Sequence, residues 1–89
     1  MNKTHFVTTN MWRFTWKRQM HGTVLVHSVP TTLEYFRYQG KWLRSMSRRR
    51  AQEAARRIAR QPSGYEHDDE LRHEGHQDAW HLCAYEAIP

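Results

Sequence analysis

The sequence predicts an α+β fold: a small antiparallel β-sheet of about five strands with one basic α-helix packed on one face, in the order ββββαβ. Two observations support this prediction. Polar and apolar residues alternate near both ends of the chain, in residues 11–17 and 79–88, and alanines recur at helical spacing within residues 48–60. Because a chain of 89 residues supports a single hydrophobic core, residues 1–89 are predicted to form one domain.

Three large aromatic residues share one side of the first predicted strand. They are Trp12, Phe14 and Trp16, and they alternate with polar residues across 11–17, as in a half-buried strand. Interleaved with basic residues, such a row resembles the stacking platforms that bind single-stranded nucleic acid. Core packing is the more economical interpretation, because a domain this small needs its largest aromatics inside.

The next three strands are predicted from composition and turn signals. Residues 23–29 are rich in valine, and Pro30 is expected to end this strand because proline cannot donate to a central ladder. Residues 33–38 and 41–46 are rich in aromatics and flank a Gln-Gly pair, which predicts a hairpin. Two tyrosines near that turn are expected to be exposed, Tyr35 and Tyr38.

The helix over residues 48–60 has a start signal, a stop signal and a docking face. Ser47 is the expected N-cap, and Pro62 and Gly64 end the helix. One stripe of small and apolar residues at helical spacing would pack on the sheet. Its members are Ala51, Ala54, Ala55 and Ile58. Residues 79–88 then alternate again and predict the last strand, with Leu82 and Tyr85 on opposite sides.

Charge is divided unequally along the chain, whose formal net charge is +5. Residues 1–60 hold thirteen of the fourteen Lys and Arg but only two acids, a net charge of +11. Residues 61–89 hold one base and seven acids, a net charge of −6. Clustered basic charge favours an anionic partner, with nucleic acid as the leading expectation.

The predicted helix is the expected site of that binding. Three consecutive arginines in its first turn oppose the helix macrodipole, an arrangement that suits phosphate because backbone N–H groups and guanidinium groups point the same way. The expected function is non-enzymatic binding of DNA or RNA, mainly through phosphate contacts and without sequence specificity. The expected contact residues are Lys41, Arg44, Arg48, Arg49, Arg50, Arg56, Arg57 and Arg60.

Three alternatives use the same arginines differently. They form a solvated helix face, they are neutralised by the chain's own acids such as Asp68, Asp69 and Glu70, or they grip an acidic protein surface. In the last case the protein would be an accessory or inhibitory factor, of the kind phages and plasmids use against a host nucleic-acid-processing or defence machine. That alternative rests on size and charge alone.

Residues 61–78 are acidic and rich in histidine, which predicts a long loop or a partly ordered segment. The candidate metal ligands there and in the last strand are His73, His76, His81 and Cys83. Their spacing matches no zinc-finger pattern, so no metal, no cofactor and no catalytic residue is predicted.

Cellular context is predicted from cysteine usage and hydropathy. A lone cysteine, Cys83, allows no intramolecular disulfide, and no window is apolar enough for a signal peptide or a membrane span. The expectation is a cytoplasmic protein that does not engage membranes. An exposed sheet edge would also allow two copies to pair as a homodimer.

Overall fold

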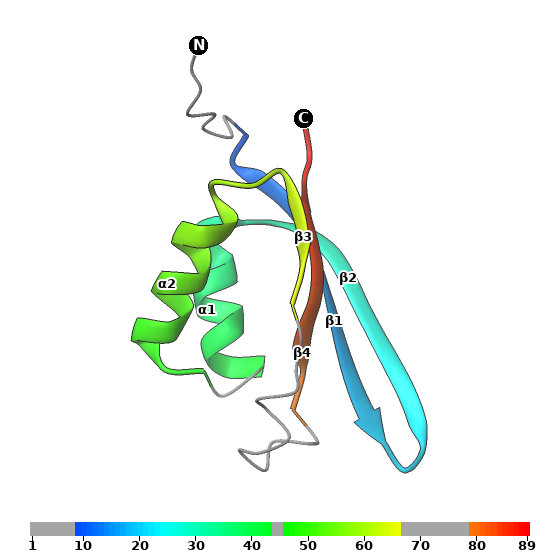
Figure 1. Ribbon diagram of the computed structural model, residues 1–89. Coiled ribbons are helices and arrows are strands. Elements are labelled where there is room, and N and C mark those ends of the chain that lie inside the picture. Colours follow the sequence, from blue (N-terminus) through cyan, green and yellow to red (C-terminus); the bar gives the residue numbers. More distant parts are fainter. Residues whose placement is uncertain (1–8, 44–45, 67–78) are drawn as a thin grey trace.

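A four-stranded antiparallel sheet carries both helices on one face (Figure 1). The computed structural model describes residues 9–43, 46–66 and 79–89. The elements are β1 (Met11–Met20), β2 (Thr23–Thr32), α1 (Leu33–Leu43), α2 (Arg48–Ile58), β3 (Ser63–Tyr65) and β4 (His81–Ala87). The strands lie in the order β2-β1-β4-β3, and each neighbouring pair is antiparallel. The α+β class and the helix-covered antiparallel sheet are confirmed. The described residues form four strands and two helices, so they do not match the predicted five or so strands, and the single helix and the order ββββαβ are wrong.

β1 is the strand on which the core is built. Its residues Trp12, Phe14 and Trp16 are fully buried under the helices, which confirms the core interpretation over the stacking platform. Phe36 of α1 stacks on Phe14 with ring centroids 4.5 Å apart and lies 5.7 Å from Trp16. Aromatic burial of this kind is the largest apolar contribution available to so small a core.

β2 is an edge strand of the sheet formed by the described residues. A two-residue turn with positive φ at His21 (49°) and Gly22 (79°) joins it to β1, as in the tight hairpins that match strand twist. The strand continues through Pro30 to Thr32, so the predicted end at Pro30 is wrong. Proline is tolerated in an edge strand, where a missing donor leaves no central ladder incomplete.

α1 replaces the predicted hairpin over residues 33–38 and 41–46. Residues 33–43 form one helix, and Thr32 caps it by accepting a hydrogen bond from the Tyr35 backbone N–H at 3.1 Å. Gly40 lies inside the helix rather than in a turn, and an added Cβ there would lie 3.1 Å from Met46 Sδ. Burial of Phe36 and this close approach at Gly40 outweigh the strand preference of the aromatic residues.

α2 confirms the predicted helix and its docking face. Ser47 is the N-cap, and its Oγ accepts a hydrogen bond from the Arg50 backbone N–H at 3.2 Å. The four buried residues of the helix are those predicted, Ala51, Ala54, Ala55 and Ile58. Small side chains on this stripe allow α2 to lie close to α1 and to the sheet.

β4 returns between β1 and β3, and it contains a bulge. Thr15 pairs with Ala84 while the next residue of β1, Trp16, pairs with Leu82, so Cys83 is an extra residue. The bulge brings Leu82 and Tyr85 to the same helix-covered face, so their predicted separation onto opposite sides is wrong. β3 lies in a segment predicted to be a loop. Its Gly64 lies opposite Tyr85, so close that a Cβ would clash with the phenol ring.

Candidate nucleic-acid interface

The two helices enclose a hollow lined by basic side chains, here called the basic groove. Its volume is about 230 Å³, and three cations reach it: Arg37 and Lys41 from α1 and Arg48 from the first turn of α2. The other lining residues are Glu34, Tyr38, Ala51 and Gln52. Lys41 and Arg48 are both predicted contact residues, and the structure brings them together although seven positions separate them.

The predicted arginines of α2 do not form one continuous surface. At about 100° per residue, Arg49 and Arg56 lie opposite the buried stripe, and both are exposed. Arg60 follows the helix and is exposed as well. Arg50 is partly buried, and Arg57 lies on the flank away from the basic groove. Arg44 lies outside the described residues.

Acidic partners neutralise some of these cations. Arg57 Nη2 lies 2.5 Å from Glu66 Oε2, and Arg49 pairs with Glu53 one helical turn further on at 3.6 Å. In the basic groove, Arg37 pairs with Glu34 at 3.5 Å. Among the described residues, no acidic side chain lies within 4.0 Å of three further cations. These are Lys41, Arg48 and Arg56.

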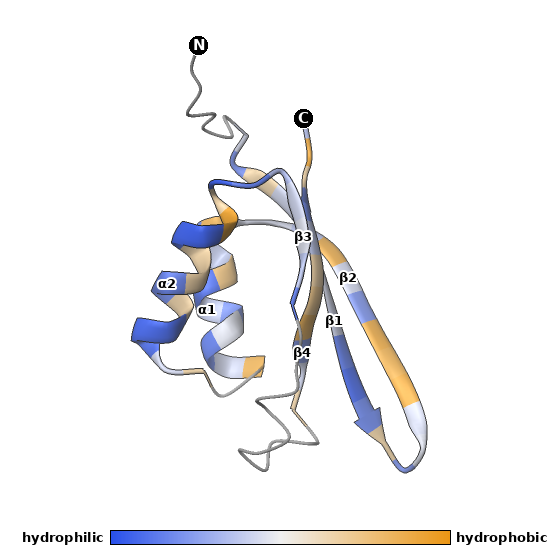
Figure 2. Ribbon diagram, viewed as in Figure 1, coloured by the Kyte–Doolittle hydropathy of each residue, from blue (hydrophilic) through white to orange (hydrophobic). Residues whose placement is uncertain are grey.

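Neutralisation by the chain's own acids therefore applies to part of the predicted site. Glu66 does provide it for Arg57, whereas the acids named for this role, Asp68, Asp69 and Glu70, lie outside the described residues. Exposed ion pairs stabilise a protein by at most about 1 kcal/mol, so the pairs at Arg37 and Arg49 leave their guanidinium groups available to a stronger anion. Figure 2 shows in blue the hydrophilic residues along α2.

α1 exposes a row of three aromatic rings. Tyr35, Tyr38 and Trp42 are 51%, 55% and 65% exposed, and successive ring centroids are 5.9 and 5.6 Å apart. Exposure of the tyrosine pair confirms that prediction, although the pair lies on a helix and not beside a hairpin. Large aromatic residues on a surface are typical of binding sites, because their burial on contact is strongly favourable.

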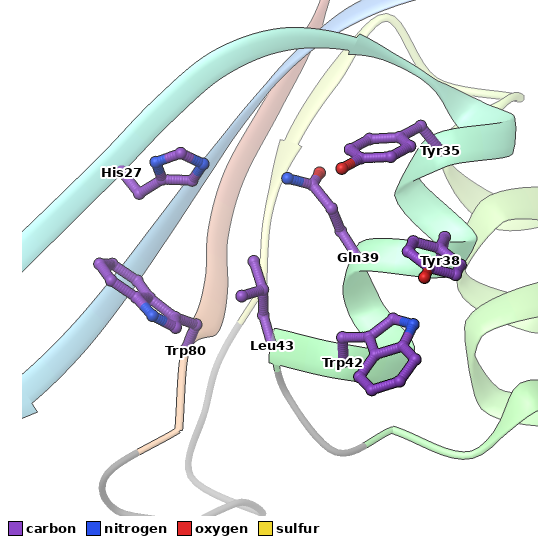
Figure 3. A pocket seen from close by; sticks show the side chains of 7 residues that line it. All are labelled: His27, Tyr35, Tyr38, Gln39, Trp42, Leu43 and Trp80. Atoms are coloured by element: carbon purple, nitrogen blue, oxygen red, sulfur yellow. The ribbon is translucent and has the colours of Figure 1, made fainter.

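The aromatic row forms one wall of a second hollow, here called the aromatic pocket (Figure 3). Its volume is about 320 Å³. Its lining residues are His27, Tyr35, Tyr38, Gln39, Trp42, Leu43 and Trp80. The opposite wall is an edge contact between His27 and Trp80, with ring centroids 5.8 Å apart. A hydrogen bond from the Trp80 backbone N–H to the Leu43 carbonyl (2.9 Å) ties that wall to the end of α1.

Tyr38 belongs to both hollows, so they are adjacent. Along α1, Arg37 and Lys41 face α2, while Tyr35 and Trp42 face the side of β2 and β4. α1 therefore carries a cationic surface and an aromatic surface side by side, and Tyr38 lies where they meet. The predicted site included Lys41 from this helix but none of the aromatic residues.

Tyr85 holds the far end of α2 against the sheet. Its hydroxyl donates a hydrogen bond to Gln61 Oε1 at 3.0 Å, and its ring lies 6.0 Å from that of Trp12. Burial raises the pKa of the Tyr85 phenol above its usual value, the Glu66 carboxylate raises that pKa further, and Arg57 acts in the opposite sense. Tyr85 lines neither the basic groove nor the aromatic pocket, so this contact lies outside both hollows.

Of the four candidate metal ligands, the structure describes two, His81 and Cys83. His81 is buried at the start of β4 and Cys83 is the bulge residue, while His73 and His76 lie outside the described residues. Within residues 9–43, 46–66 and 79–89, no three His, Cys, Asp or Glu side chains cluster closely enough to hold a metal ion. In the same part of the chain, no helix is long and apolar enough to cross a membrane.

Comparisons with family models, with curated proteins and with solved structures find no match to this chain.

Sequence reasoning missed Arg37, Trp42 and Gln39 as site residues because it assigned their segment to strands. A helical signal was present: Leu33, Phe36, Gly40 and Leu43 recur at spacings of three and four residues, and Thr32 precedes them as an N-cap. On such a helix, Arg37 and Lys41 share one flank, and Tyr35, Tyr38 and Trp42 share the other. The helical assignment would therefore have grouped the α1 part of the candidate site.

Proposed function

We propose that this protein is a non-enzymatic domain that binds nucleic acid, preferably single-stranded, on the surface formed by α1 and α2. The observation that supports it best is the juxtaposition of the basic groove with the exposed aromatic row of α1. Proteins that bind single strands combine a cationic path for the phosphates with aromatic faces for the bases. In this proposal Lys41 and Arg48 contact phosphates, helped by Arg37, Arg49 and Arg56.

Local concentration of charge argues for this side of the sheet. On the opposite face, Arg13 pairs with Glu86 at 4.0 Å, and Thr15 lies 3.3 Å from Ser28 across the hairpin. That face exposes Lys17 from β1. The helix side therefore combines cations with exposed rings, whereas the opposite face has fewer of both.

The test is fluorescence anisotropy of labelled single-stranded DNA, duplex DNA and RNA at increasing salt. Single strands are expected to bind more tightly than duplex, with affinity that falls steeply with salt. Lys41→Ala and Arg48→Ala should each weaken binding. Each should also reduce the slope of log K against log salt by about 0.7 for every phosphate of a single strand that the variant no longer neutralises.

Lys17→Ala is the matched control, because it removes the same charge from an exposed position on the opposite face. It should change affinity much less than Lys41→Ala. Equal losses of affinity in the two variants would mean that binding follows net charge and that no interface exists. Absence of binding at low salt would overturn the proposal altogether.

A second candidate function is protein binding through β2. Among the described residues this strand has a neighbour on one side only, and Thr23–Thr32 contains no Lys, Arg, Asp or Glu. Val24 and Val26 are 56% and 59% exposed, and Figure 2 shows the hydrophobic stretch. An uncharged apolar edge is a template for strand addition by a partner, as an accessory or inhibitory factor would use.

Edge binding has its own test. Val26→Lys places a charge on the strand without touching either helix, so it should abolish a stoichiometric complex with a protein partner and leave nucleic-acid affinity unchanged. Lys41→Ala should do the reverse. A complex that survives nuclease treatment and is insensitive to Val26→Lys would contradict this second function.

A further inference from the structure

We propose that the aromatic pocket receives one unstacked nucleobase of a single-stranded chain whose phosphates lie in the basic groove. This inference rests on the proposed function and specifies what the second hollow does. The pocket has rings on two walls, His27 and Trp80 from the sheet and the aromatic row of α1. A planar ring that enters between them can stack on an aromatic face, the main source of affinity for unpaired bases.

The charge of the pocket favours a neutral ligand. None of its described lining residues is Lys, Arg, Asp or Glu, so it offers an anion no cation and a cation no carboxylate. Phosphate is better placed across Tyr38 in the basic groove. A volume of about 320 Å³ lies at the lower end of the range for small-molecule sites, which suits a single base rather than a folded peptide segment.

Gln39 gives the pocket an amide group, which can form hydrogen bonds with the edge of a nucleobase. Its Oε1 is buried and makes no hydrogen bond to the protein, and Figure 3 shows its amide pointing between His27 and Tyr35. A buried amide oxygen without a partner is unfavourable, and a wholly apolar ligand would leave it so. A nucleobase edge presents both donors and acceptors, which an amide can match with its own acceptor and donor.

The order of the two hollows also fits a nucleotide. Within one nucleotide, the base and the phosphate lie at opposite ends of the sugar. The two hollows lie on opposite flanks of α1 and share Tyr38. A single strand laid over α1 would place its backbone on Arg37 and Lys41. A base unstacked from that strand would then face Trp42 and Gln39.

The experiment compares an intact oligonucleotide with one of the same length and charge in which every nucleoside is abasic. Wild-type protein is expected to bind the intact strand at least about fivefold more tightly, the lower end for one base stacked on an aromatic side chain. Trp42→Ala should remove this preference, and Trp42→Phe should restore part of it. Trp42 is exposed, so neither change is expected to prevent folding.

Two further variants separate the pocket from the groove. Gln39→Met keeps a side chain of similar length and should reduce the preference for the intact strand, because the base edge then has no amide with which to form a hydrogen bond. Tyr65→Ala removes an aromatic ring that is 82% exposed and lines neither hollow, so the preference should persist. Lys41→Ala should weaken binding of both strands by the same factor.

The outcomes distinguish the two proposals. Equal affinity of wild-type protein for the intact and the abasic strand would overturn base binding while leaving phosphate binding standing. A preference that survives Trp42→Ala would place the base elsewhere and also overturn it. Failure of both strands to bind at low salt would overturn the proposed function and this inference together.

Discussion

α1 and α2 lie on the same face of one sheet, yet they differ in both their buried and their exposed surfaces. α2 buries alanines and Ile58 and exposes mainly charge, whereas α1 buries Phe36 and exposes charge beside an aromatic row. Charge attracts any phosphate chain, but exposed rings discriminate in favour of unstacked bases. Under the proposed function, α2 supplies attraction and α1 supplies selectivity.

The largest expected effect is the loss of stability when the buried residue that packs each helix on the core is replaced by alanine. Phe36→Ala should lower the free energy of unfolding by about 3–5 kcal/mol, because it removes the ring between Phe14 and Trp16. Ile58→Ala should cost about 2–5 kcal/mol on α2. Urea denaturation followed by circular dichroism measures both. Tyr38→Ala is the exposed aromatic control on α1 and should change stability by no more than about 0.5 kcal/mol. An equally small value for Phe36→Ala would show that Phe36 does not anchor α1.

The caps should be equivalent, which tests whether the helices differ only in their surfaces. Thr32→Ala removes the side-chain acceptor at the start of α1, and Ser47→Ala removes the one at the start of α2. Each is expected to lower stability by about 1 kcal/mol. Thr32→Ser and Ser47→Thr keep the hydroxyl and should cost little. A loss of stability at one helix alone would show that the other is held by packing without its cap.

Charge in the first turn should have opposite effects at the two helices. α1 begins with Glu34, which suits the macrodipole, while α2 has no acid in its first turn. Arg48→Glu is therefore expected to raise the free energy of unfolding by about 0.3–1 kcal/mol, measured as a higher melting temperature. The same change should weaken nucleic-acid binding. Glu34→Lys should lower stability by a similar amount. A destabilising Arg48→Glu would mean that the cation is needed for folding.

The smallest expected effect is a loss of stability at alkaline pH, caused by Tyr85 near the C-terminal end of α2. Because the folded state holds the phenol proton of Tyr85 more tightly than the unfolded chain does, its contribution to stability is present below about pH 10 and lost as pH rises through the raised pKa. Thermal melts of wild type and Tyr85→Phe across that range measure it. Tyr85→Phe cannot ionise at this position, so it should lose less stability on alkaline titration.

The difference between the helices also explains what the sequence allowed us to predict. β1 and α2 have strong local periodicity that agrees with their packing. The alternation at Trp12, Phe14 and Trp16 was therefore sufficient to predict β1, and the alanine stripe was sufficient to predict α2. α1 is rich in strand-forming aromatics and contains Gly40, so its local preference points to a hairpin. The Thr32 cap and the spacing of the apolar residues favour the helical form, and packing against β1 and Met46 stabilises it.

The candidate site, like the fold, could be predicted only in part from the sequence. The arginines of α2 were evident, but their directions depend on where α1 packs, and only Arg48 shares the basic groove with Lys41. The aromatic pocket joins α1 to His27 and to Trp80, residues that no local pattern relates. β3 and the bulge likewise depend on a pairing partner, which a single strand's alternation does not contain.

The bulge in β4 makes the length of that strand adjustable at one point. Cys83 is extra to the pairing with β1, so deleting it would leave Leu82 opposite Trp16 and Ala84 opposite Thr15 and would join them in a regular ladder. A deletion elsewhere in a strand normally turns every following side chain to the other face. Deletion at Cys83 would therefore keep each core side chain on its face, although it would remove the carbonyl that accepts a hydrogen bond from the Glu66 backbone N–H at 3.1 Å.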